Sequence, residues 1–441
     1  MTPDQLSDFP FDIPYANGSV TLWEGRADLA QNGLEIPGTS KLIYTLVPHP
    51  RVECPFQSND ASVFVSIDAD DPHVVIHDGS PLSLPVHIRS INVGSHCPTR
   101  FEAVVRQPFC LGLSEEAHSI IFQVLNFWEF LATSDVICAF ADGREERVPC
   151  LRLGSDRWQV EMTGLPQSKD HIREAKATEG FAVTHIGTLK RPHGERFTFQ
   201  DAHAFLDMFH YFLGFVRGLW CGPTLVVGRD KHGEMGWWHA SNAVVSPWLP
   251  CRSWLPTTHA EVLVDLFPSF VRHWCDPVWE EPLRHAIYWH VLANTLPNVD
   301  AGIILLQNAL ELLAWTYLGS KGQKRRGTAK DKIRRSLAAL GIDAGIPDEP
   351  AKLLGQCGKL EDIPDALTKA RNAIVHPDNR NRGKFDGVLP VISKLGLWCT
   401  ELAMLKLLAY SGLYSNRLKS CWRGDEQSVP WADKHGANKK A

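Results

Sequence analysis

The spacing of apolar residues changes near Phe197, and this change limits the folds that the chain can adopt. Before it, short runs such as 62–68 and 85–89 have the two-residue period of strands, with turn signals such as Asp78-Gly79 between them. One segment is ambiguous, because 114–131 fits a helix whereas 119–127 within it also fits a strand. We predict a β-rich N-terminal region that forms a sandwich or barrel with at most one helix.

After Phe197 the apolar residues recur with the helical period. Thr198 and Asp201 resemble a helix N-cap with an acid three residues on, which predicts a helix that ends near Gly218 or Gly222. A short strand is expected at 224–228, before a connector rich in Trp and Pro. Further helices are expected at 259–275, 279–295, 300–318, 328–341, 360–376 and 388–413.

The order of these elements predicts an α+β fold with four parts. They are a β-rich N-terminal domain at 1–195, a mixed connecting region with a long helix at 196–278, an all-α helical bundle at 279–418 and a polar tail at 419–441. A chain of 441 residues is too long for one ordinary core, which agrees with such a division.

Charge and composition restrict the classes of function. A net charge of −5 gives no overall attraction to nucleic acid, so any such binding must be local. Eleven cysteines without a Cys-x-x-Cys pair indicate free thiols in a reducing compartment. The chain starts without the pattern of a signal peptide, and no uninterrupted apolar run reaches the roughly 18 residues that a membrane helix needs. We therefore expect a cytoplasmic protein without membrane contact.

One short motif suits phosphate chemistry, namely Arg371-Asn372-Ala-Ile-Val-His376, followed by Pro377. A guanidinium binds phosphoryl oxygens, and an imidazole transfers protons near pH 7. The looser pattern of Arg, four to six residues and His occurs five times in the chain. Only this occurrence has Asn after the Arg and lies late in a predicted helix, which Pro377 should end near His376.

Helix geometry places the three side chains of the motif unequally. Asn372 and His376 are four residues apart and share a face, so the amide could orient the imidazole. Arg371 lies five residues before His376, roughly 140° away around the axis. Arg371 and His376 of one chain therefore do not converge directly on one atom. A second copy of the motif, or bending at the helix end, would bring them around one phosphate.

At this point the sequence resembles a known family. The motif matches the Arg-x4-6-His signature of HEPN domains in its Arg-Asn-x-x-x-His form. The resemblance covers roughly residues 280–415, where 302–315 looks like the family's first long helix and 388–414 like its last. The Pro-Trp-Ala sequence at 430–432 is similar to that of the bacterial ApeA-like HEPN group, of the abortive-infection type. The N-terminal half resembles the β-rich domain often fused there.

The resemblance implies a helical bundle that forms a homodimer with two motifs facing each other. It implies metal-independent RNA cleavage without a cofactor, in which the 2′-OH attacks the adjacent phosphate and leaves a cyclic phosphate and a 5′-OH. His376 would act as general acid or base, Arg371 would stabilise charge on the phosphoryl oxygens, and Asn372 would orient His376 or the phosphate. The implied role is toxicity on activation, in defence against phage or in stress, with an N-terminal domain that senses an unknown trigger or selects the substrate.

Two further groups of residues could support such a site. Gln307 and Glu311 share a face of an apolar predicted helix, where a buried carboxylate needs a partner such as Arg371. The segment 321–335 holds eight basic residues and one acid, which makes it the best candidate for RNA contact or, alternatively, a solvated face. The candidate RNA-binding residues in it are Lys321, Lys324, Arg325, Arg326, Lys330, Arg334 and Arg335.

Other candidate ligand groups have simpler interpretations. His203, Asp207 and His210 share one helix face but sit among phenylalanines, so a structural role is expected and no metal site is assigned. The histidine pair His73 and His77 and the acidic turn 68–71 are read in the same way. The sequence motifs of P-loop NTPases, α/β-hydrolases and zincins do not occur in the chain.

Two alternatives to a ribonuclease remain open at the level of the sequence. The bundle could be a non-catalytic module that binds nucleotides, nucleic acid or another protein, with Arg371 and His376 only holding an anion. The β-rich half could bind or process carbohydrate, although no paired-carboxylate signature supports that alternative.

Overall fold

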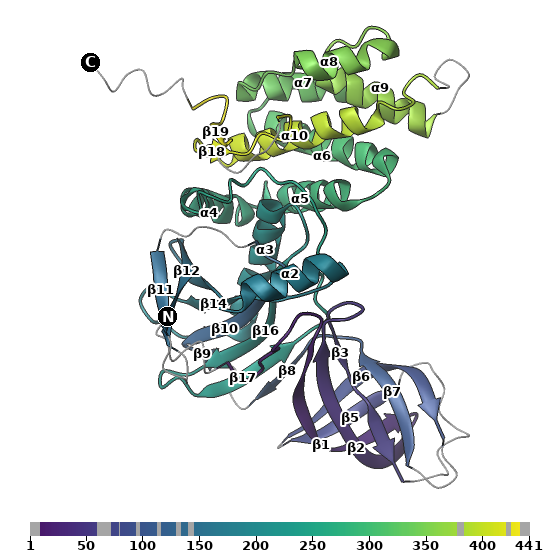
Figure 1. Cartoon of the computed structure of the whole chain (residues 1–441), viewed down its shortest axis with the longest axis vertical. Coiled ribbons are helices and arrows are strands. Elements are labelled where there is room, and N and C mark those ends of the chain that lie inside the picture. Colours follow the sequence, from purple (N-terminus) through teal and green to yellow (C-terminus); the bar gives the residue numbers. More distant parts are fainter. Residues whose placement is uncertain are drawn as a thin grey trace.

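The computed structural model describes residues 9–59, 72–78, 80–93, 98–112, 116–128, 134–139, 145–376, 383–419 and 425–432. The fold is α+β, with β structure first and helices afterwards, as predicted. Figure 1 shows three parts stacked along the long axis: a small barrel, a larger sheet and a group of helices. The expected strand at 62–68 and the acidic turn 68–71 lie outside the described residues.

The first part is a closed antiparallel barrel. Its strand order is β1-β5-β6-β7-β3-β2, and β1 pairs with β2 to close the ring, while β4 also bridges β2 and β7. Closure leaves no open sheet edge, and the alternating burial of β7 fits a filled interior. The strands are β1 (Ser19–Gln31), β2 (Leu34–Thr45), β3 (Arg51–Glu53), β4 (Phe56–Ser58), β5 (His73–Asp78), β6 (Ser80–Asn92) and β7 (Thr99–Val105).

The second part is an eight-stranded antiparallel sheet in the order β11-β12-β13-β14-β10-β16-β17-β8. Two of its strands follow residue 195, so β structure continues into the expected connecting region as far as Ala240. The strands are β8 (Phe109–Gly112), β10 (Ser119–Leu125), β11 (Ser134–Ala139), β12 (Glu145–Gly154), β13 (Gln159–Gly164), β14 (Val183–Lys190), β16 (Gly222–Arg229) and β17 (Met235–Ala240). A separate two-stranded pair joins β9 (Glu116–Ala117) to β15 (Phe197–Thr198).

Strand β10 decides the ambiguous segment 114–131 in favour of a strand, and it is buried on both faces. Phe122 and Val124 face the helices, whereas Ile121 and Leu125 belong to the core that includes the barrel interior. A strand buried on both faces has a continuous apolar run without a two-residue period, which is why the sequence left this segment undecided. The large sheet therefore separates two hydrophobic cores.

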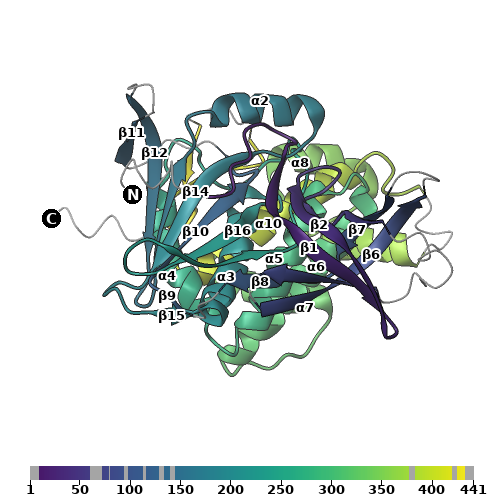
Figure 2. The same ribbon diagram turned by 90° about the horizontal axis from the view of Figure 1, so that it is seen from below.

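Helices α2 (Ser168–Thr178) and α3 (Phe199–Arg217) both contact this sheet. Helix α2 was not predicted and lies beside β14, as Figure 2 shows. Helix α3 begins with the predicted capping box, in which Thr198 and Asp201 bond each other's backbone, and ends at Gly218 with φ 69°. Because α3 packs on β16 and on α5, it joins the sheet to the helical part.

The helical part is built around α6. This helix packs against four others, and its burial confirms the reading of its apolar sequence. By length and composition α6 could span a membrane, but 56% of its most apolar stretch is buried inside the protein. The helices are α4 (Glu261–Trp274), α5 (Glu280–Thr295), α6 (Val299–Ser320), α7 (Ala329–Leu340), the unpredicted α8 (Asp348–Leu353), α9 (Ile363–Val375) and α10 (Leu389–Leu407), with a 3₁₀ turn at Leu354–Cys357.

The segment after α10 folds back on the protein, contrary to the expected polar tail from residue 419. Strands β18 (Leu413–Tyr414) and β19 (Gln427–Ser428) pair, and the buried Trp431 donates to the Tyr410 carbonyl at 2.6 Å. Residues 425–432 are thus part of the folded structure.

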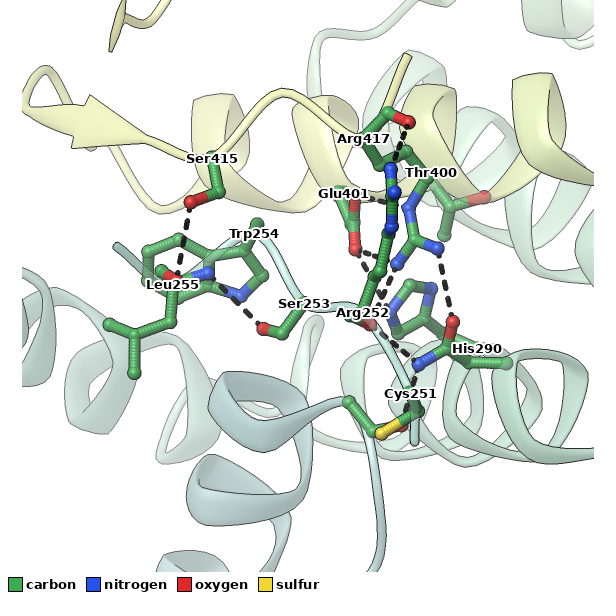
Figure 3. A network of polar contacts seen from close by, with 12 residues as sticks. Cys251, Arg252, Ser253, Trp254, Leu255, His290, Thr400, Glu401, Ser415 and Arg417 are labelled. Carbon is green, nitrogen blue, oxygen red and sulfur yellow. Dashed lines mark hydrogen bonds and ion pairs between the residues drawn. The ribbon is translucent and has the colours of Figure 1, made fainter. Parts of the chain in front are cut away.

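A buried ion pair fixes this returning segment (Figure 3). Arg417 donates from Nε and Nη2 to the two carboxylate oxygens of Glu401 on α10, at 2.9 and 2.5 Å. It also donates to the Asn294 side chain and to the Arg252 carbonyl. His290 lies against the same carboxylate, 3.7 Å away, and burial lowers its pKa to about 3. Five hydrogen-bond donors of one guanidinium suit such a junction of three segments.

Candidate functional site

The motif occupies the last turns of α9, as predicted. Asp362 caps the start of the helix by accepting a hydrogen bond from the Asp365 N–H at 2.9 Å. At the other end the His376 N–H still donates to the Asn372 carbonyl at 2.8 Å, but His376 itself has φ −125° and ψ 70°. The helix therefore ends at Val375, with His376 as its C-cap residue, while Pro377 lies outside the described residues.

A groove of about 430 Å³ runs between α6, α7 and α9 and contains part of the motif. We call it the α9 groove. Arg371 and Asn372 line it, whereas His376 does not. The lining residues are Gln307, Asn308, Glu311, Thr328, Ala329, Lys330, Asp365, Thr368, Lys369, Arg371 and Asn372.

Asp365 is a buried carboxylate in the wall of the α9 groove, and two lysines bond it. Lys330 donates to Oδ1 at 3.0 Å, while Lys369 and the Glu361 N–H donate to Oδ2 at 2.7 and 3.1 Å. Burial alone would raise the pKa of Asp365, but the hydrogen bonds from Lys369, Glu361 and Lys330 outweigh it and lower the pKa to about 2. The carboxylate is therefore charged at neutral pH and holds both ammonium groups at the groove.

Arg371 contributes a guanidinium that no carboxylate neutralises among the residues that the structure describes. Its Nη1 donates to Asn372 Oδ1 at 3.2 Å, so the two neighbours contact each other directly. The expected partner of Asn372 was the His376 imidazole, but no hydrogen bond joins these two side chains within the described ranges. Arg371 and Asn372 together present one cation and one amide to the groove.

Two oxygens in the groove are buried without a hydrogen-bond partner in the described part of the chain. They are Oε1 of Gln307, whose side chain is 5% exposed, and Oγ1 of Thr368. A buried polar oxygen without a partner costs roughly 1–3 kcal/mol, so a ligand that donated a hydrogen bond here would recover part of that cost.

Glu311 has a different partner from the one considered. It accepts from Lys332 Nζ at 2.6 Å, and its side chain is 35% exposed. Glu311 is therefore neither fully buried nor paired with Arg371, although both side chains line the α9 groove. The helix α7 places Lys332 opposite Glu311, and this approach of α7 to α6 is not visible in the sequence.

Fewer cations of the basic segment 321–335 are available to contact RNA than its composition suggests. Lys330 bonds Asp365, and Arg334 bonds Asp362 and Glu361, so two of the seven candidate RNA-binding cations are paired with carboxylates. Arg335 donates to backbone carbonyls of the loop before α7. Arg325 donates to the Trp315 carbonyl and lies over its ring at 4.7 Å. Lys321, Lys324 and Arg326 are exposed on the loop.

The two candidate histidines of the barrel bond protein groups. His73 contacts Ser83, and His77 pairs with Asp28 at 2.7 Å, both on the barrel. Among the described residues no group of three or more His, Cys, Asp or Glu side chains could hold a metal ion.

The sequence analysis missed Lys369, Asp365 and Thr368 of the α9 groove, although the spacing of four between Asp365 and Lys369 is a recognisable ion-pair signal.

Two parts of the sequence match known domain families. Residues 276–428 match the YopA C-terminal domain. Residues 113–250 match the YopA central domain. The first range contains the α9 groove, and the second contains most of the large sheet together with α2 and α3.

A relative along the whole chain is the SPbeta prophage-derived uncharacterized protein YopA of Bacillus subtilis strain 168. It is 29% identical over 444 residues, which cover 97% of this chain and 98% of the relative. No solved structure matches the chain.

Proposed function

We propose that the chain is a metal-independent endoribonuclease of HEPN type, with its site at the C-terminal end of α9. The observation that supports it most is the position of Arg371. Its guanidinium lines a groove in which Asp365 holds two lysines, and no described carboxylate neutralises it. Such a groove suits a phosphodiester, since Arg recognises phosphoryl oxygens with two parallel hydrogen bonds.

The proposed reaction uses only groups of the protein and the RNA. A 2′-oxygen of the ribose attacks the adjacent phosphorus and loses its proton, the bond to the 5′-oxygen breaks, and that oxygen takes up a proton. The products are a 2′,3′-cyclic phosphate and a 5′-OH. His376 transfers a proton in one of these steps, and Arg371 stabilises the charge that builds on the phosphoryl oxygens. Asn372 holds the guanidinium in place.

The site requires a second copy of the chain. Arg371 and Asn372 line the groove but His376 does not, so one copy supplies an incomplete set. His376 and the neighbouring Val375 are exposed at the end of α9, where a second α9 can approach. We propose a homodimer in which His376 of one chain completes the groove of the other.

The wider role is proposed from the family resemblance. RNA would be the substrate, the protein would act in the cytoplasm, and activation by an unknown trigger at the N-terminal domain would stop growth of a phage-infected cell. Lys321, Lys324 and Arg326 would steer RNA toward the groove because they are exposed on the adjoining loop.

A second function is favoured by one observation. Because His376 does not line the α9 groove, the groove could bind a nucleotide or nucleic acid without cleaving it. In that case His376→Ala would leave RNA binding and any growth effect unchanged, while Arg371→Ala would weaken both.

The test is cleavage of a fluorescently labelled RNA by the full chain in excess EDTA. We expect cyclic phosphate ends, and we expect His376→Ala and Arg371→Ala to slow cleavage by roughly 10²–10⁴-fold, as for loss of a proton carrier or an electrostatic stabiliser. His285→Ala, which changes an exposed histidine of α5, is the matched control and should cleave normally. Cleavage that needs Mg²⁺, or equal rates in all variants, would contradict the proposal.

A further inference from the structure

A second cavity, of about 270 Å³, lies far from the motif in the sequence, between α3, β16 and the segment 241–245. Its walls are mainly apolar, with Phe199, Leu206 and Val226 among them. Three histidines also line it, His203 and His210 from α3 and His239 from β17. The sequence singled out His203 and His210 on one helix face, and β17 adds the third.

The imidazole of His239 is the feature that points to a ligand. Its side chain is 8% exposed, and its Nε2 is buried without a hydrogen-bond partner among the described residues. The rings of Phe199 and His203 lie against it, with centroids 4.9 and 5.8 Å away. A buried ring nitrogen that no described group of the protein satisfies leaves a hydrogen bond for an occupant of the cavity.

The backbone of the cavity wall is also unusual. Leu225 has φ 47°, a conformation that a bulky residue rarely adopts, and the pairing of β10 with β16 shifts register beside it. The adjacent Thr224 accepts or donates a hydrogen bond with Tyr44 of the barrel at 2.6 Å. Strained backbone of this kind collects at ligand sites more often than elsewhere.

Three of the ionisable groups that line the cavity carry no unpaired charge. The Asp207 carboxylate bonds Arg284 of α5 at 2.8 Å. Burial lowers the pKa of His210 and of His239 to about 4, so both imidazoles are neutral at physiological pH. Among the described groups that line the cavity, the Asp207 carboxylate is thus paired and the imidazoles of His210 and His239 are uncharged.

We propose that this cavity binds a small, neutral, planar nitrogen heterocycle of about the size of a purine base. Its volume is just below the range of about 300–1,000 Å³ that is usual for larger ligands. The rings of Phe199, His203 and His239 offer faces and edges for an aromatic occupant. A nitrogen heterocycle carries donors and acceptors side by side, so it can bond either neutral tautomer of His239.

The proposal does not depend on the nuclease, and its test contains no RNA. Adenine is titrated into the full chain by calorimetry, and saturable binding is expected. His239→Phe keeps a ring of similar shape but removes the nitrogen, so affinity should fall at least tenfold. Benzoate, a planar anion, should bind at least tenfold more weakly than adenine. His232→Phe alters an exposed histidine of the turn between β16 and β17 and should bind adenine normally.

A second variant protects the test against misfolding. Ser241 lines the cavity, and Ser241→Phe should fill it and abolish binding while the unfolding temperature stays close to that of the unchanged chain. The proposal is overturned if adenine does not bind the unchanged chain, if benzoate binds as well as adenine, or if Ser241→Phe binds adenine as well as the unchanged chain does.

Discussion

At the scale of single residues, Asp365 organises the charge of the α9 groove. It is buried, it bonds Lys330 and Lys369, and both lysines then face the space that Arg371 lines. The position of Arg371 and Asn372 late in α9 could be predicted from the motif and Pro377. The partner of Glu311 could not be predicted from the sequence. Lys332 and Arg371 are both cations, and only the packing of α7 on α6 decides which of them bonds Glu311.

The ion pairs of Asp365 predict a stability that depends on pH. Its folded pKa is lowered to about 2, below its value in the unfolded chain, so its contribution is complete above about pH 5 and is lost as the pH falls from about 4 to 2. Asp365→Asn should therefore lower the free energy of unfolding by about 2 kcal/mol at pH 7 and by progressively less below pH 4. Urea unfolding of both proteins between pH 7 and pH 2.5 measures this.

The matched control for this measurement is Asp348→Asn, because Asp348 is an exposed carboxylate in the first turn of α8. Its free energy of unfolding should match that of the unchanged chain at every pH. A difference for Asp365→Asn that stayed constant down to pH 2.5 would show that its carboxylate is not held ionised by the two lysines.

At the scale of elements, the sequence predicted most helices within a few residues. The helical period and the caps placed α3, α4, α5, α6, α7 and α9 close to their observed bounds. Helix α10 ends six residues before the predicted end at residue 413. Ala409 takes φ 55°, and the Tyr410 N–H then bonds the Leu405 carbonyl. The apolar pattern of the sequence continues past the end of α10, because the residues that follow are buried by packing against other segments of the protein.

The N-cap of α9 gives the prediction at this scale. The Asp362 side chain accepts from the Asp365 N–H and also from Arg334 Nε, at 2.9 and 2.5 Å. Asp362→Ala should lower the free energy of unfolding by about 1–2 kcal/mol through loss of the cap. It should also slow RNA cleavage, because α9 carries Arg371 and His376. Chemical denaturation and the cleavage assay measure the two effects.

The neighbouring carboxylate of Glu361 serves as the control, because it bonds the same Arg334 at 3.0 Å but caps no helix. Its side chain is 53% exposed, so Glu361→Ala should change the free energy of unfolding by less than about 0.5 kcal/mol. If Asp362→Ala and Glu361→Ala lowered the free energy of unfolding equally, the effect of Asp362 would come from its contact with Arg334 and not from the helix cap.

At the scale of the whole molecule, the arrangement of the three parts was the least predictable feature. A closed barrel and a larger sheet both appear as short strands in sequence, and only long-range pairing separates them. Strands β16 and β17 follow the long helix α3 yet pair with β10 and β8, which lie about 100 and about 130 residues earlier. Local periodicity contains no information on such partners.

At the same scale we propose that each cleavage site of the dimer takes Arg371 from one copy of α9 and His376 from the other, so that a dimer has two sites. Chains with Arg371→Ala and chains with His376→Ala should each be inactive alone. After mixing in equal amounts and exchange of subunits, half of the dimers are mixed, and each mixed dimer has one of its two sites intact. The mixture should then cleave RNA at about a quarter of the rate of the unchanged protein. A mixture as inactive as its two components would contradict the account.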